Sequence, residues 1–177
     1  MCEMEVRMKT SVLNLAIVAT LFAGAANAAE VSVKWGEVKS FTDFEAVNEL
    51  KSRFEERTKA NFTEYVEALG QKLPEQNKLQ VTFNDVDLAG RVEPTFGATS
   101  SAFQRILDDI SYPHLVISYK YTDAQGSVLS EAENVELKSL APPRNIRNVM
   151  GSSRDALYFE KELLQDWFRE TFPDAAD

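Results

Sequence analysis

The strongest constraint on the fold is a change in the spacing of apolar residues along the chain. Apolar and polar residues alternate over 31–36, 79–84 and 114–121, which is the period of a half-buried β-strand. A more polar segment at 129–137 is interpreted as a partner strand. The residues Asp-Ala-Gln-Gly at 123–126 are typical of a turn. The last two segments are therefore predicted to form an antiparallel hairpin.

Two other segments have helical spacing. The first begins at Thr42, where Thr-Asp-Phe-Glu has the spacing of a capping box, and runs to about Leu69. The second begins near residues 152–155 and runs to about Thr171. The predicted apolar faces are, for the first helix, Val47, Leu50, Phe54, Thr58, Phe62, Tyr65 and Leu69, and for the second, Phe159, Leu163, Leu164, Trp167 and Phe168.

Three features between these elements are irregular. After Asn84 the alternation changes phase, because Asp85 and Asp87 take positions of apolar parity, and this predicts a β-bulge or a strand end. Glycine and proline make residues 89–101 loop-like. Residues 102–110 have helical spacing but are too few to separate a helix from a strand.

The order of these elements predicts one α+β domain over residues 29–177. We expect a single, mainly antiparallel sheet of four to five strands. The long N-terminal helix and the C-terminal helix would pack on one face of it. Residues 139–151, with Pro142-Pro143 and Gly151, are expected to connect elements rather than form one.

Residues 1–28 have the pattern of a secretory signal peptide. A short basic region precedes an apolar run over 12–25, and Ala26-Asn27-Ala28 supplies the small residues that signal peptidase recognises. The run is shorter than the roughly 20 residues that span a bilayer, so we expect cleavage after Ala28 and no stable membrane insertion. Met8 is an alternative start to Met1, because acidic residues between the two are unusual in a signal peptide.

Cleavage would remove the only cysteine, Cys2, and leave a chain without a thiol or disulfide. The net charge is −9, and it is the same without residues 1–28, where two basic residues balance two acidic ones. Such a charge argues against nucleic acid as a partner.

The sequence contains few patterns that indicate catalysis. It lacks the Gly-x-Ser-x-Gly, His-Glu-x-x-His and phosphate-loop motifs, and we expect no cofactor. The only histidine, His114, directly follows Pro113 at a predicted strand start, where a structural role is favoured. No catalytic residue is therefore assigned.

Three carboxylates remain as weak candidates. Asp85 and Asp87 could bind a hard cation such as Ca²⁺, although the twelve-residue calcium loop is absent. Glu160 falls within the apolar arc of the last helix, so it is either paired or has a raised pKa. We favour a buried structural carboxylate, paired with Arg91 or Arg105, over an acid or base.

A set of short motifs in a fixed order resembles the bacterial domain-of-unknown-function family 3016, exported proteins of the Gram-negative envelope. The motifs are Val33-Lys34-Trp35, Phe41-Thr42-Asp43, Asp85-Val86-Asp87-Leu88-Ala89-Gly90, Tyr112-Pro113, Tyr158-Phe159-Glu160-Lys161, Leu164 and Asp166-Trp167-Phe168. The resemblance implies a periplasmic location, a single α+β domain and a strand at Gln104–Ile110. It implies no activity, and Pro142-Pro143 departs from the family's pattern.

These observations favour a periplasmic, non-catalytic binding or accessory domain of the cell envelope. Its partner would be an envelope protein or a small ligand, bound at the loop 85–97 or at an uncovered sheet edge. One alternative is a carboxylate-based or cation-dependent hydrolase that uses Asp85, Asp87 and Glu160. Another is a structural domain stabilised by calcium.

Overall fold

The structure is a computed structural model that describes residues 29–107, 110–138 and 155–175. The expected signal segment, 1–28, and the connector, 139–151, lie outside the described residues. The chain folds as an α+β protein, as the spacing of apolar residues predicts.

Four strands form the main sheet, in the order β1-β2-β5-β6. β1 pairs in parallel with β2, and the other neighbours are antiparallel. The mainly antiparallel sheet and the hairpin of β5 and β6 are thereby confirmed. The strands span Glu30–Trp35 (β1), Lys78–Asp87 (β2), His114–Thr122 (β5) and Val128–Lys138 (β6).

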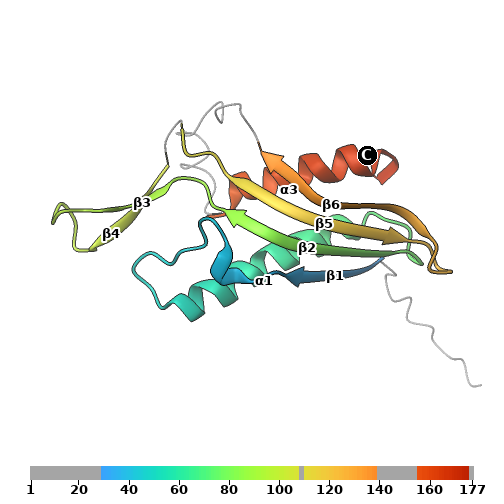
Figure 1. The fold of residues 1–177 in the computed structure, drawn as a ribbon, viewed down its shortest axis with the longest axis horizontal. Helices are drawn as coiled ribbons and strands as arrows, with labels where there is room; N and C mark the ends of the chain where they lie inside the picture. Colours follow the sequence, from blue (N-terminus) through green and yellow to red (C-terminus); the bar gives the residue numbers. More distant parts are fainter. Residues whose placement is uncertain (1–28, 108–109, 139–154, 176–177) are drawn as a thin grey trace, which may run out of the picture.

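Helices α1 (Lys51–Gly70) and α3 (Tyr158–Thr171) lie behind the sheet in Figure 1. Two short 3-10 helices span Val38–Ser40 (η1) and Pro173–Ala175 (η2). The core between the sheet and helices is rich in aromatic rings, and Trp35 stacks on Phe83 at 4.5 Å. The largest fully buried apolar side chains are Phe62, Phe83, Phe168, Leu79, Leu115, Ile117 and Leu164.

The predicted bulge in β2 is confirmed. The pairing of β2 with β5 shifts between Phe83 and Asp85. Val86 is fully buried after the shift, whereas Asp85 and Asp87 are only half-buried. The change of phase in the sequence therefore keeps apolar residues on the core side of the strand.

The prediction of a single sheet is wrong. Strands β3 (Arg91–Pro94) and β4 (Phe103–Ile106) form a second, two-stranded sheet, which we call the arm. The arm projects from one end of the main sheet (Figure 1). Residues 89–101 are therefore not all loop, and the strand alternative for 102–110 is confirmed over the span of β4, whereas the helix alternative is wrong.

The chain enters the arm at Gly90, where only glycine fits the backbone conformation and the space. Gly90 has a φ of +82°, and a Cβ there would lie 2.4 Å from the carbonyl oxygen of Ile106. At the start of β4, next to the loop that joins the two arm strands, the side chain of Asn48 donates to the Phe103 carbonyl oxygen at 2.5 Å and accepts from its N–H at 3.4 Å. A side chain thus takes the place of a third strand at this point.

The predicted start of the first helix at Thr42 is also wrong, because α1 begins at Lys51 and is not N-terminal in the fold. The Thr42 hydroxyl and N–H donate to Asp85, at 2.6 and 2.7 Å, rather than capping a helix. Asp43 forms a β-bridge with Asp87. Long-range contacts therefore hold this segment in an extended form that its local capping pattern would not favour.

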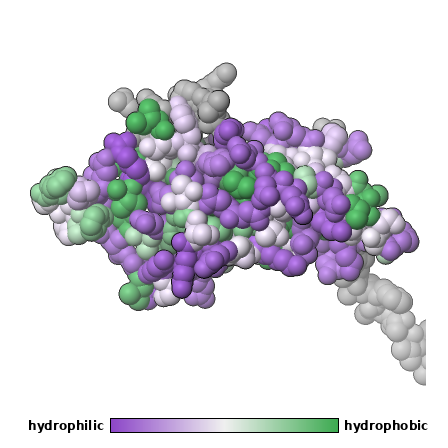
Figure 2. All heavy atoms as spheres, viewed as in Figure 1, coloured by the Kyte–Doolittle hydropathy of each residue, from purple (hydrophilic) through white to green (hydrophobic). Residues whose placement is uncertain are grey.

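Polar residues cover much of the face shown in Figure 2, and apolar residues gather at the arm. Phe96 lies in the loop that connects the two arm strands, and its side chain is 93% exposed. Among the described residues, no helix is both long and apolar enough to span a membrane.

Candidate functional site

Glu160 lies in the first turn of α3 and is 1% exposed. Its Oε1 accepts a hydrogen bond from the N–H of Ala89 at 2.7 Å. Its Oε2 is buried and has no hydrogen-bond partner among the described residues. A buried carboxylate oxygen without a partner costs free energy, typically about 1–3 kcal/mol or more when charged.

Burial raises the pKa of Glu160 to about 6. The Ala89 N–H, the N–H of Glu160 itself and the positive charge of Arg105 act in the opposite direction, and the charge of Asp155 raises the pKa further. Because these lowering effects do not cancel the desolvation, the pKa of Glu160 stays above its ordinary value. At pH 7, which is above a pKa of about 6, the carboxyl group is mainly ionised.

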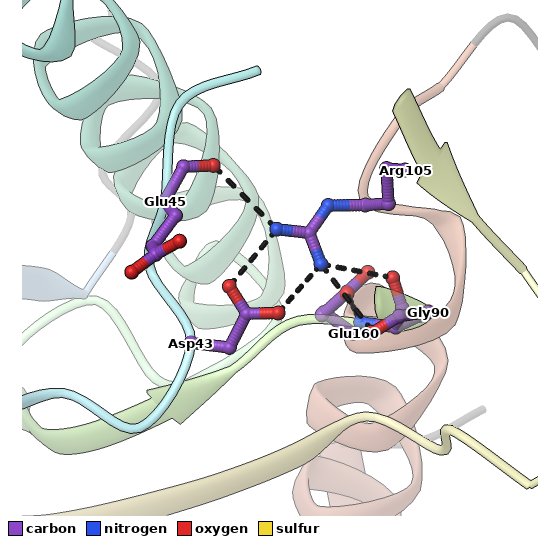
Figure 3. A network of polar contacts seen from close by, with 6 residues as sticks. Asp43, Glu45, Gly90, Arg105 and Glu160 are labelled. Atoms are coloured by element: carbon purple, nitrogen blue, oxygen red, sulfur yellow. Dashed lines mark hydrogen bonds and ion pairs between the residues drawn. The ribbon is translucent and has the colours of Figure 1, made fainter. Parts of the chain in front are cut away.

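Arg105, from β4, connects the arm to the main domain (Figure 3). Its two terminal nitrogens donate to the two carboxylate oxygens of Asp43, at 2.8 and 2.9 Å. Longer contacts reach the carbonyl oxygens of Ala89, Gly90 and Glu45, at 3.4, 3.5 and 3.5 Å. Both side chains of this pair are about four-fifths buried. The two parallel hydrogen bonds fix the position and the orientation of the Arg105 guanidinium relative to Asp43.

Glu160 and Arg105 also line one pocket, with a volume of about 270 Å³. The pocket lies where the N-terminal half of α1, the N-terminus of α3 and the turn between β2 and β3 meet. Its remaining lining is mostly apolar, with three further polar residues from α1. The lining consists of Phe54, Arg57, Thr58, Asn61, Leu88, Ala89, Arg105, Leu107, Ala156, Leu157 and Glu160.

Two of the polar residues on the α1 side of the pocket, Arg57 and Asn61, have partners within the protein. Arg57 donates to Glu49 at 2.6 Å, and its guanidinium lies 5.9 Å from the centre of the Phe54 ring. The side-chain amide oxygen Oδ1 of Asn61 accepts a hydrogen bond from the ammonium group of Lys161 at 2.6 Å. Both arginines of the pocket therefore face a carboxylate already, whereas the Oε2 atom of Glu160 does not.

The other sequence candidates lie elsewhere. Asp85 and Asp87 do not line the pocket. Asp85 accepts from Thr42 and from the N–H of Val86, and so supports the bulge. Burial raises the pKa of Asp87, and the charges of Asp43 and Asp85 add to this effect. Within the described residues, no three carboxylate, histidine or cysteine side chains are grouped so that they could hold a metal ion.

The expected arginine partners of Glu160 have other direct contacts. Arg91 pairs with Glu93 at 2.5 Å. Arg105 pairs with Asp43 and is linked to Glu160 through Ala89, whose N–H reaches the carboxylate and whose carbonyl reaches the guanidinium. Sequence reasoning missed Asp43, because the residue lay inside the supposed capping box, and it missed Ala89, because a backbone group has no sequence signature.

Two further buried nitrogen atoms and a larger hollow lie outside this pocket. His114 Nε2 and Trp167 Nε1 are also buried without a hydrogen-bond partner among the described residues, but neither residue lines the pocket. A larger hollow of about 660 Å³ lies at the other end of the sheet, beside the C-terminal ends of α1 and α3. No buried ionisable group comparable to Glu160 lines it.

The fold and the pocket define an α+β domain with a buried acidic group beside a small cavity. Residues 29–170 match the family described as "Protein of unknown function (DUF3016)". The chain belongs to this family, which confirms the resemblance seen in the sequence motifs. A search of curated proteins and a search of solved structures found no match to the chain.

Proposed function

We propose that the protein is an exported, non-catalytic binding domain of the cell envelope and that the pocket at Glu160 receives a small ligand. The location rests on the signal-peptide pattern of residues 1–28. The family match starts at residue 29, directly after the expected cleavage position, which supports the same boundary.

The observation that carries the binding proposal is the buried Oε2 atom of Glu160. Proteins rarely leave a buried ionisable oxygen without a hydrogen-bond partner, and such groups occur where a ligand completes the contacts. The pocket around it combines apolar walls with a few polar groups, as small-molecule sites do. Its volume lies near the lower end of the roughly 300–1,000 Å³ common for such sites.

Neither alternative function has comparable support. A hydrolase that uses three carboxylates needs them in one cavity, but Asp85 and Asp87 are absent from the lining of the Glu160 pocket. A calcium-stabilised domain needs several oxygen ligands around one point, and the described part of the chain contains no such group. Binding without catalysis needs only the arrangement at Glu160.

Thermal unfolding with pools of small metabolites tests the binding proposal. We expect at least one pool to raise the melting temperature of the wild-type protein and of Glu162→Gln, but not of Glu160→Gln. Glu162 is the matched control, because it is exposed on the same helix and its carboxylate accepts a hydrogen bond from the Tyr158 hydroxyl at 2.7 Å. Equal stabilisation of all three proteins, or none in any pool, would contradict the proposal.

The location has a separate test. We expect the protein in the periplasmic fraction of a Gram-negative host, with Ala29 as its first residue by N-terminal sequencing. A variant in which Ala26 and Ala28 are both replaced by Leu should retain the apolar run but resist cleavage. Recovery of the uncleaved wild-type chain in the cytoplasm would refute export.

A further inference from the structure

We infer that the ligand of the Glu160 pocket is a small organic ammonium ion with a short apolar tail. This inference rests on the binding proposal above and adds the chemical class of the ligand. It follows from which polar atoms at the pocket are engaged within the protein and which are not.

The charge distribution at the pocket favours a cation. Arg105 is neutralised by Asp43 and Arg57 by Glu49, at distances of 2.8 and 2.6 Å. The remaining charge is the carboxylate of Glu160, whose Oε2 atom can accept up to two hydrogen bonds. An ammonium group supplies three N–H donors and the opposite charge, whereas an anion would be repelled by Glu160.

The shape and lining of the pocket favour an organic cation over a metal ion. The apolar surface of the pocket comes from Phe54, Leu88, Leu107 and Leu157. These side chains would receive an alkyl tail and would exclude water from the ammonium–carboxylate contact. A bare divalent cation would need further oxygen ligands, and none are grouped with Glu160 in the described structure.

The net charge of the molecule also favours a cationic ligand. At −9 the chain attracts cations to its surface and repels anions over a distance of about 8 Å at physiological ionic strength. This field does not select a site by itself. The buried carboxylate at the pocket selects the site, and the field increases the local concentration of the ligand.

Three probes of similar size and shape test the inference: butylammonium, butanol and butyrate. Each is titrated into the purified protein while the amide resonance of Ala89 is followed by NMR, because the Ala89 N–H donates directly to Glu160. We expect butylammonium to shift this resonance saturably and to bind at least about tenfold more tightly than butanol or butyrate. Glu162→Gln should bind it as the wild type does, and Glu160→Gln at least about tenfold more weakly.

The outcomes separate the ligand class from the binding proposal. Tighter binding of butanol or butyrate at Ala89 would overturn the ammonium inference while leaving a small-molecule site in place. Equal affinity of wild type and Glu160→Gln for butylammonium would also overturn it. If no probe shifts Ala89 and no metabolite pool stabilises the protein, both proposals fail. The wild-type titration does not depend on any variant that could fail to fold.

Discussion

Glu160 and Arg105 bind the two backbone polar groups of one residue, Ala89. The N–H of Ala89 donates to Glu160 at 2.7 Å, and the carbonyl oxygen of Ala89 accepts from Arg105 at 3.4 Å. One residue of the β2–β3 turn thereby joins the N-terminus of α3 to the arm (Figure 3). A change at either charged side chain is expected to reach the other through this backbone.

The first prediction concerns stability and pH in Glu160→Gln. Burial raises the pKa of Glu160 from an ordinary 4.5 to about 6, so the folded state holds this proton more tightly than the unfolded chain. The stabilisation is complete below pH 4.5 and is lost as pH rises through 6. We expect the wild type to lose about 2 kcal/mol relative to the variant over this range, from 1.36 kcal/mol per pKa unit.

The measurement is urea unfolding of both proteins at a series of pH values. The difference between the two curves isolates Glu160, because Asp87 and the other carboxyl groups are common to both proteins. Arg105 and Asp155 are the charged groups that act on Glu160, and both are also unchanged. Parallel pH profiles for the two proteins would contradict a raised pKa at this site.

The second prediction concerns the pair of Arg105 and Asp43. Lysine at 105 keeps the charge but cannot donate two parallel hydrogen bonds to the carboxylate. We expect Arg105→Lys to lower the free energy of unfolding by about 1–3 kcal/mol, between the values for exposed and buried pairs. In a double-mutant cycle with Asp43→Asn, the two effects should not add.

Arg169→Lys is the control for this prediction. Arg169 pairs with Asp166 on the exposed side of α3, and both side chains are more than half exposed. Surface substitutions of this kind usually change stability by less than about 0.5 kcal/mol. If Arg105→Lys were as mild as this control, the pair would not hold the arm in place.

The sequence predicted the parts of the fold that depend on periodicity. The alternation of β1, β2 and β5 and the turn before β6 were sufficient to place the main strands, and the phase change at Asp85 was sufficient to place the bulge. Thr42 shows the limit of the method. Its spacing to Glu45 indicates a helix cap, but its hydroxyl bonds to Asp85, far along the chain, and no local pattern announces that contact.

The candidate site was predictable to a similar extent. The burial of Glu160 follows from its position on the apolar arc of α3, and the structure places it there. Its surroundings were not predictable, because they consist of a backbone N–H from Ala89 and a pocket assembled from four separate segments. Of the arm, the family resemblance implied a strand in the region of β4. The strand β3 was missed because it is short and because Gly90 and Pro94 are typical of loops.

The third prediction compares two glycines with the same backbone conformation. Gly90 and Gly97 have φ values of +82° and +84°. Alanine at either position pays the cost of a left-handed residue, about 1–2 kcal/mol. Alanine at 90 would also place its Cβ against the Ile106 carbonyl oxygen, whereas alanine at 97 meets nothing within 4 Å.

We therefore expect Gly90→Ala to be the more destabilising variant by at least about 1 kcal/mol in chemical unfolding. It should also displace the Ala89 N–H and change the Ala89 amide shift, which Gly97→Ala should leave unchanged. Equal losses in both variants would show that only the backbone conformation matters at Gly90.

The last prediction concerns the bulge and the segment that follows β1. Thr42 donates two hydrogen bonds to the Asp85 carboxylate, one from its hydroxyl and one from its N–H. Thr42→Val removes the hydroxyl and preserves the shape, so we expect a loss of about 1–2 kcal/mol, typical of a hydrogen bond to a charged group. Asp85→Asn should lose less, because an amide oxygen still accepts one of the two bonds.

Thr99→Val is a suitable control, because the Thr99 hydroxyl makes only local contacts with Ser101 among the described residues. It donates to the Ser101 carbonyl oxygen at 3.2 Å and accepts from the Ser101 N–H at 3.3 Å, in the exposed tip of the arm. The three variants can be compared by thermal and urea unfolding at neutral pH. If Thr42→Val is no more destabilising than Thr99→Val, then Asp85 does not hold the segment after β1 against the bulge. In that case the late start of α1 would need a different cause.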